Sequence, residues 1–257
     1  MDQEVLVFMI LLRLILPFVI YDLALTLASL ATPPTVSILF VNGLGALIAI
    51  PFLYALLRRD RIRAGAPAAT RPIPAPFCGR ILLFGAAVSV AVNNLLTLSG
   101  IARLFPSFDQ EVVPLLYSPP LLIQVVCIGL LVPAAEELIF RGQVFSLLRA
   151  KMPWRAAVLL SAFIFALYHG NMVQGIYAFV LGLLMAWLYE KSGSLMAPWL
   201  FHAGANLCSV FLTFAGNHFP AILTFPMFLI QTGIAVGAVV ALGPEMRREC
   251  EENGGRE

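Results

Sequence analysis

Two adjacent glutamates, Glu136 and Glu137, lie in a long apolar stretch of the sequence, where charged side chains are rare. Arg141 stands four residues after Glu137, and on a helix this spacing puts acid and base on one face in the favourable order for an ion pair. Glu136 is rotated by about 100° on the same helix and has Phe140 four residues ahead of it. We therefore predict that Glu137 and Arg141 form a structural pair, and that Glu136 stays free to act as a general base.

Two histidines and an asparagine occupy the apolar stretches that follow. Phe165 precedes His169 by four residues, so its ring can form one wall of a pocket around that imidazole. His202 and Asn206 have the same spacing and present an imidazole and a carboxamide together. A lone intramembrane histidine is commonly an interhelical hydrogen-bonding residue. Two of them beside an unpaired glutamate favour a functional site, because ionisable groups cost about 2.5–3.5 kcal/mol each in a bilayer.

The composition places these residues in a membrane. Of 257 residues, 60% are hydrophobic and 12% are charged, whereas soluble domains are about 45–50% apolar and about 25% charged. A helix needs roughly 20 apolar residues to cross a bilayer. The sequence therefore predicts an all-α fold, a polytopic membrane bundle of about eight transmembrane helices, with apolar runs at about 4–30, 35–57, 80–99, 119–149, 156–170, 172–190, 195–215 and 220–243.

The basic residues give these spans an orientation, because cytoplasmic loops carry an excess of Lys and Arg. Eight spans leave only Arg103 on the side opposite the N-terminus, and Arg13 and Arg141 within spans. All other basic residues fall on the side of the N-terminus: Arg58, Arg59, Arg61, Arg63, Arg71, Arg80, Arg149, Lys151, Arg155, Lys191, Arg247, Arg248 and Arg256. We predict cytoplasmic termini and, from the short chain, a bacterial inner membrane. The net charge of +2 and these positions indicate lipid as a partner and no nucleic acid.

Two prolines near the polar residues predict an opening in the bundle. Pro133 just precedes Glu136, and Pro198 lies near the start of the helix that carries His202, so both can bend their helices. Glu136 and His169 each lie about 13 residues from the cytoplasmic ends of their helices, which is roughly 20 Å at 1.5 Å per residue. We expect one water-accessible cavity that opens toward the cytoplasm. Asn93 and Asn94 are expected to be packing or cavity residues.

Three ordered motifs on successive predicted helices carry a family resemblance. Glu-Glu-x-x-x-Arg at 136–141, Phe-x-x-x-His at 165–169 and His-x-x-x-Asn at 202–206 resemble the CPBP family. That family comprises CAAX prenyl endopeptidases and bacteriocin-processing or self-immunity proteins. The resemblance covers about residues 119–215 and implies an intramembrane endopeptidase that acts on a membrane-associated protein or peptide.

The resemblance also implies a role for each motif residue. Glu136 would activate the attacking water with help from His169, and His202 and Asn206 would donate hydrogen bonds to the oxyanion of the tetrahedral intermediate. Glu137, Arg141 and Phe165 would support them. Proteins of this kind are often labelled metalloproteases, and zinc would here be held by Glu136, His169 and His202. We favour a mechanism without metal or other cofactor, because His-Glu-x-x-His does not occur and asparagine is a poor zinc ligand.

Three segments organise the chain in this reading. Residues 1–118 form N-terminal transmembrane helices with a basic cytoplasmic loop at 58–80, residues 119–215 form the catalytic core, and residues 216–257 form the last transmembrane helix and a cytoplasmic tail. Two other functions stay open. A non-catalytic membrane scaffold or immunity protein has the same fold, and an ion-coupled transporter is less expected because no internal repeat is visible.

Overall fold

The structure is a computed structural model that describes residues 3–67 and 70–254. Helices make up all of the regular secondary structure within these two ranges, which confirms the all-α fold. The α-helices are α1 (Gln3–Ala31), α2 (Ile38–Arg63), α3 (Ala75–Ser99), α4 (Ile101–Leu104), α5 (Val113–Tyr117), α6 (Leu121–Val126), α7 (Val132–Glu137), α8 (Ser146–Arg149), α9 (Trp154–Tyr168), α10 (Met172–Ser192), α11 (Met196–His218) and α12 (Phe225–Gly254). Three π-helical segments, η1 (Phe108–Val112), η2 (Cys127–Leu131) and η3 (Leu138–Phe145), and a 3₁₀ turn, η4 (Pro220–Leu223), complete them.

Seven helices in the described ranges are long and apolar enough to cross a membrane. They are α1, α2, α3, α10, α11, α12 and the continuous rod of α6, η2, α7, η3 and α8, which spans Leu121–Arg149. The remaining predicted span, at 156–170, corresponds to α9, which has 15 residues. It is therefore only about 22 Å long, whereas the hydrocarbon core of a bilayer is roughly 30 Å thick. The polytopic bundle is confirmed, with one helix shorter than a full span.

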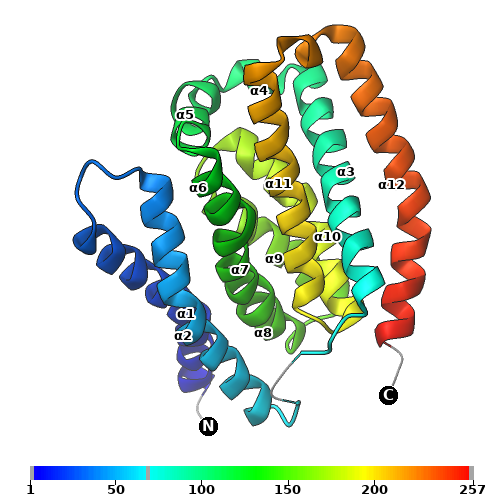
Figure 1. Cartoon of the computed structure of the whole chain (residues 1–257). Coiled ribbons are helices and arrows are strands. Elements are labelled where there is room, and N and C mark those ends of the chain that lie inside the picture. Colours follow the sequence, from blue (N-terminus) through cyan, green and yellow to red (C-terminus); the bar gives the residue numbers. More distant parts are fainter. Residues whose placement is uncertain (1–2, 68–69, 255–257) are drawn as a thin grey trace.

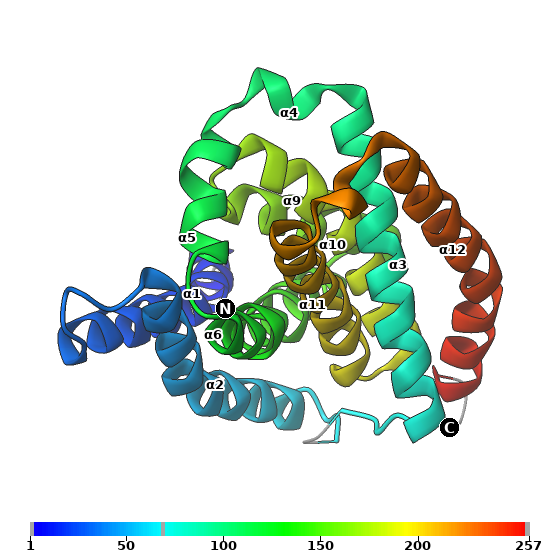
Figure 2. The ribbon, with the colours of Figure 1, turned by 45° about the horizontal axis from the view of Figure 1, so that its top comes forward.

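The two ends of the bundle differ in their residues. Figure 1 shows that α1 begins and α12 ends at the same end, where α8 and the connection from α2 to α3 also lie. We call this the basic end, because it carries the Arg-rich end of α2 together with Arg149 and Lys191. The chain from α3 to α5 arches across the opposite end (Figure 2), which we call the α4–α5 end. Arg256 lies outside the described residues.

Helices α3 and α11 cross in backbone contact. A Cβ atom on Gly85 would meet the carbonyl of Phe201, and one on Gly204 would meet the carbonyl of Leu82. Small residues allow such close approach in membrane bundles, where packing rather than hydrophobicity drives association. The crossing fixes α11 against the bundle, so His202, two residues before Gly204, faces the interior and is 5% exposed.

The rod from Leu121 to Arg149 is interrupted twice by π-helical turns. The first, η2, contains Gly129, whose carbonyl would be the i−4 partner of Pro133. Proline has no N–H to donate, and its ring clashes with that carbonyl. A wider turn removes the clash and leaves carbonyl oxygens without partners inside the helix. Pro133 therefore disturbs the rod one turn before Glu136, as the sequence predicts.

Candidate active site

Arg141 and Glu137 form the predicted ion pair at the centre of the bundle. Arg141 Nη1 donates to Glu137 Oε1 at 2.9 Å, and Arg141 Nη2 donates to the carbonyl of Gly182 at 3.1 Å. The guanidinium also lies over the Phe165 ring, 4.6 Å from its centre. Both charged side chains are fully buried. A charge in such a place needs a partner, so the pair is a fixed part of the structure.

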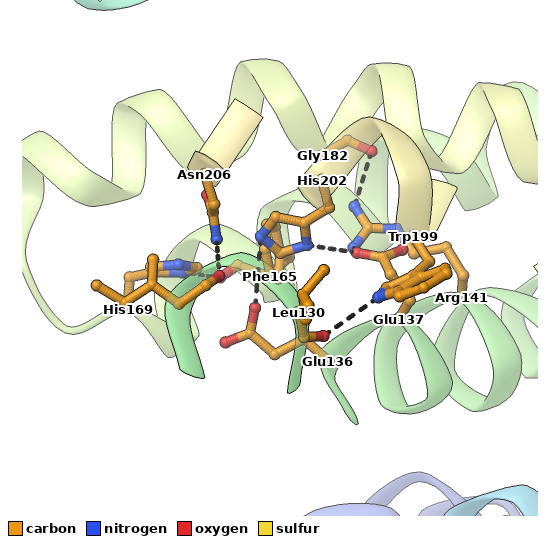
Figure 3. Close-up of polar contacts among 11 residues, drawn as sticks. Leu130, Glu136, Glu137, Arg141, Phe165, His169, Gly182, Trp199, His202 and Asn206 are labelled. Carbon is orange, nitrogen blue, oxygen red and sulfur yellow. Dashed lines mark hydrogen bonds and ion pairs between the residues drawn. The ribbon is translucent and has the colours of Figure 1, made fainter. Parts of the chain in front are cut away.

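His202 connects this pair to the second glutamate (Figure 3). Its Nδ1 lies 2.9 Å from Glu137 Oε1, and its Nε2 lies 3.7 Å from Glu136 Oε2. Glu137 Oε1 accepts from Arg141, so it can also accept a hydrogen bond from His202 Nδ1–H, and the other ring nitrogen faces Glu136. The imidazole of α11 thus lies between the two carboxylates of α7, a contact that spacing along the sequence does not reveal.

Glu136 differs from its neighbour in both exposure and partners. Glu136 is 9% exposed and Glu137 is 0% exposed. Glu137 has Arg141 and His202 within 2.9 Å, whereas the nearest described basic nitrogen to Glu136 is His202 Nε2. Glu136 also lines a cavity, together with His169, His202 and Asn206. In the structure, Glu137 is therefore the buried carboxylate of an ion pair and Glu136 is the accessible one, as the sequence predicts.

His169 is held at the end of α9. Its Nδ1 lies 2.9 Å from the carbonyl of Phe165, one of the last carbonyls of that helix, which lack intrahelical partners. A carbonyl only accepts, so Nδ1 carries the hydrogen, and Nε2 of the neutral ring is an acceptor. The Phe165 ring packs edge-on against both His169 and His202, at 4.8 and 5.8 Å between ring centres. Phe165 therefore forms the predicted wall beside His169 and also contacts His202.

Two side chains of α11 dock on carbonyls that the first π-helical turn exposes. Asn206 donates from Nδ2 to the carbonyl of Ile128 at 2.9 Å, and Trp199 donates from Nε1 to the carbonyl of Leu130 at 3.2 Å. Asn206 has two N–H groups on that nitrogen, so one orients the carboxamide and the other is left for the cavity. The sequence analysis did not identify Trp199; its spacing of seven residues from Asn206, two helical turns, is the signal that could have found it.

A cavity of about 280 Å³ brings the four predicted catalytic residues together. Three further carboxamides, which come from three different helices, line it as well: Asn42, Asn93 and Gln174. Asn93 was expected as a packing or cavity residue, whereas Asn42 and Gln174 carry no distinctive sequence signal. Burial raises the pKa of Tyr117, another lining residue, to about 12, so its hydroxyl stays protonated and uncharged.

The cavity extends toward the α4–α5 end. Its lining includes Phe108 in η1, Leu116 in α5 and Leu39 at the start of α2, and it includes no residue of the segments 58–80, 150–155 or 191–194. The expectation that the cavity opens at the end with the basic segments is therefore wrong. Helix length gave the depth of Glu136 correctly as mid-bundle, but depth alone does not show which end of the bundle is closed by packing.

A metal site does not emerge from these donors. Across residues 3–67 and 70–254, no three His, Cys, Asp or Glu side chains lie close enough together to hold a metal ion. Glu136 and His202 approach each other, but His169 does not complete a triad with them. The set proposed for zinc, Glu136, His169 and His202, therefore does not converge on one point in this arrangement. The four cysteines are free.

Comparison with known proteins gives one match. Residues 118–208 match the model of the family described as type II CAAX prenyl endopeptidase Rce1-like. No curated protein and no solved structure matches the chain. The matched segment contains Glu136, Glu137, Arg141, Phe165, His169, His202 and Asn206. The match supports the resemblance of this helical core to the CAAX prenyl endopeptidases of the CPBP family.

Proposed function

We propose that this protein hydrolyses a peptide bond of a membrane-associated substrate with a water molecule activated by Glu136. The observation that carries the proposal is the environment of Glu136, which is the one acidic residue that lines the cavity. Its neighbour Glu137 is held in the ion pair with Arg141, so Glu136 is the carboxyl that is left to meet a water molecule in the cavity. A carboxylate within reach of a water and a carbonyl carbon can serve as a general base.

The proton steps follow from the groups present. Glu136 accepts a proton from the water as its oxygen attacks the carbonyl carbon, and the carbonyl oxygen becomes an oxyanion. The carboxyl of Glu136 then returns that proton to the leaving nitrogen as the C–N bond breaks. His169 presents the acceptor Nε2 to the same cavity, where it can hold the water for attack. Atoms and charge balance with the peptide and one water molecule as the reactants.

The oxyanion needs donors that are in place before it forms. Asn206 is held by Ile128 through one N–H, which leaves its second N–H for the oxyanion. His202 is oriented by Glu137 and directs Nε2 toward the cavity, where it can donate once it carries a proton. This arrangement requires no metal, and donors of this kind typically contribute factors of about 10²–10³ in rate each.

We further propose that both termini are cytoplasmic and that the protein resides in a bacterial inner membrane. The start of α1 and the end of α12 share the basic end, and the positive-inside rule assigns that end to the cytoplasm. A fluorescent protein fused after residue 257 of the full chain tests the orientation. Fluorescence supports a cytoplasmic C-terminus, and a dark but exported fusion contradicts it.

Hydrolysis by the purified protein tests the enzymatic proposal. The probes are internally quenched peptides that end in a cysteine and three further residues, with and without a prenyl group on the cysteine. Glu136→Gln is expected to reduce cleavage by roughly 10²–10⁴-fold, the contribution of a general base. Glu252→Gln, the same change on an exposed turn of α12, is the matched control and should cleave normally.

Two outcomes contradict the proposal in different ways. Cleavage that survives Glu136→Gln refutes the choice of base while leaving the protease activity intact. If the folded wild-type protein cleaves neither probe, and the membrane proteomes of cells with wild-type and Glu136→Gln protein are identical, the chain is a non-catalytic scaffold of the same fold. Otherwise, proteins that accumulate uncut in Glu136→Gln cells identify the substrate.

A further inference from the structure

A groove of about 460 Å³ runs between α1 and α2, and it shares no lining residue with the cavity around Glu136. The two helices lie side by side at one edge of the molecule (Figure 1). Two matching rows of side chains, spaced by four, three and four residues so that each row shares one helix face, form the walls: Leu16, Ile20, Leu23 and Leu27 on α1, and Ile48, Phe52, Ala55 and Arg59 on α2. The buried residues Ala24 and Leu56 form the floor.

The groove is open to the bilayer and apolar over most of its length. Leu23, Leu27 and Phe52 are exposed, although α1 and α2 are both candidate membrane spans. From Leu16 to Leu27 the groove is about 16 Å long at 1.5 Å per residue, which is about half of the roughly 30 Å hydrocarbon core of a bilayer. The length of the groove therefore matches the acyl chains of one leaflet.

Arginines gather where the groove reaches the basic end. Arg59 lines the groove, and Arg13 and Arg58 stand with it about one helical turn beyond the last apolar lining residues. Asp60 is shared between Arg13 at 3.2 Å and Arg59 at 3.5 Å, and Arg58 is exposed. Three positive charges and one negative charge leave these four side chains with a net charge of +2, so this end of the groove attracts an anion.

From these observations we propose that the groove binds an anionic phospholipid, with one acyl chain between α1 and α2 and its phosphate at Arg58 and Arg59. The planar guanidinium of arginine donates two parallel hydrogen bonds to a phosphate, and basic pockets between membrane helices suit anionic headgroups. A second copy of the chain in the same membrane would bring its own arginines to the same depth, where like charges repel. Binding at this groove depends neither on peptide hydrolysis nor on which end of the bundle faces the cytoplasm.

Native mass spectrometry of the purified full chain tests the proposal, because it counts the lipids that stay bound. The protein is stripped of lipid in a neutral detergent and titrated with dioleoyl phosphatidylglycerol. A parallel series uses dioleoyl phosphatidylcholine, which has the same acyl chains and phosphate but no net charge. Arg58→Gln/Arg59→Gln removes the proposed headgroup contacts, and Arg247→Gln/Arg248→Gln, which changes two adjacent exposed arginines of α12, is its matched control.

A second pair of variants tests the apolar part of the groove. Ala55→Phe fills the groove with a ring, and Ala241→Phe makes the same change at an exposed position of α12. Size-exclusion chromatography shows whether each variant is folded and monodisperse. If Ala55→Phe is not, the smaller change Ala55→Leu replaces it, with Ala241→Leu as its control.

The wild-type chain is expected to retain one phosphatidylglycerol molecule and to bind it more tightly than phosphatidylcholine. Loss of Arg58 and Arg59 should weaken the binding of phosphatidylglycerol by roughly 30-fold, about five- to sixfold for each arginine near an anionic lipid, and leave phosphatidylcholine unchanged. The α12 arginine control should bind as the wild type does. Ala55→Phe should lose both lipids, and Ala241→Phe should lose neither.

Four results overturn the proposal. Equal binding of the two lipids by the wild-type chain shows that the groove does not select charge. Unchanged binding of phosphatidylglycerol by Arg58→Gln/Arg59→Gln, or by the groove-filling variant, places the lipid elsewhere. Displacement of the lipid by an equal concentration of glycerol phosphate, the headgroup without acyl chains, shows a site for a free anion. A lipid-free dimer that the groove-filling variant dissociates identifies a second copy of the chain as the occupant.

Discussion

Removal of the Arg141 charge gives the sharpest test of the division between the two glutamates. Arg141→Met retains an unbranched apolar stem but leaves the fully buried carboxylate of Glu137 with His202 Nδ1 as its remaining polar partner. Breaking one side of a buried ion pair typically costs about 3–5 kcal/mol, because the other charge stays buried without compensation. In the double variant Glu137→Gln/Arg141→Met no charge remains to compensate. We expect it to lose only about 1–3 kcal/mol, mainly through lost hydrogen bonds.

The double variant should therefore be more stable than Arg141→Met alone. Unfolding of the purified protein in mixed detergent and SDS micelles, followed by helical circular dichroism, measures the three free energies of the cycle. Arg149→Met is the matched control: Arg149 contacts Glu190 at 2.9 Å but is 45% exposed, so its loss should cost about 1 kcal/mol or less. If the double variant loses the sum of the two single losses, the two residues do not act as a buried pair and the reasoning is refuted.

Three further predictions concern the site and its supports. Glu136→Gln should leave the free energy of unfolding unchanged or raise it, whereas Glu137→Gln should lower it, because only Glu137 has a fixed cationic partner; equal effects in the SDS titration would contradict this. Gly204→Leu should prevent the α3–α11 contact and abolish a monodisperse peak in size-exclusion chromatography, while Gly237→Leu, whose added Cβ meets nothing within 4 Å, should not. Trp199→Phe and Asn206→Leu each lose one hydrogen bond to the η2 carbonyls, about 1 kcal/mol of stability. Asn206→Leu alone should also reduce peptide cleavage by about 10²–10³-fold; equal cleavage by the two variants would contradict the oxyanion role.

Local spacing predicted the parts of the site that lie on one helix. The four-residue separation of Glu137 and Arg141 predicts their ion pair, and the same separation predicts the contact of Phe165 with His169, because helix geometry fixes both. The position of His202 between Glu136 and Glu137 joins α11 to α7 across 65 residues of sequence. The spacing of residues along one helix cannot predict that contact. It depends on how α11 packs against α3 through Gly85 and Gly204.

The direction of the cavity was the main error, and its cause is physical. Apolar runs and basic loops show how deep Glu136 lies and which end is basic. They do not show which end is filled by side chains, because lipid-facing and core-facing leucines are equivalent in an apolar sequence. The packing of Leu138–Phe145 decides that question. The π-helical turns also cannot be predicted from the apolar runs, because an extra residue in a turn leaves the apolar character of a run unchanged. Pro133 is the residue that indicates where the first of them lies.

The arrangement of hydrogen bonds explains how one site can hold two adjacent acids with different roles. Arg141 cancels the charge of Glu137, and Glu137 in turn fixes the Nδ1–H of His202. The carbonyl of Phe165 fixes the Nδ1–H of His169 in the same way. Both imidazoles line the cavity, and Glu136 is the acidic residue in its lining. The buried pair therefore sets the orientation of His202, whose Nδ1 lies against Glu137 and whose Nε2 lies toward Glu136.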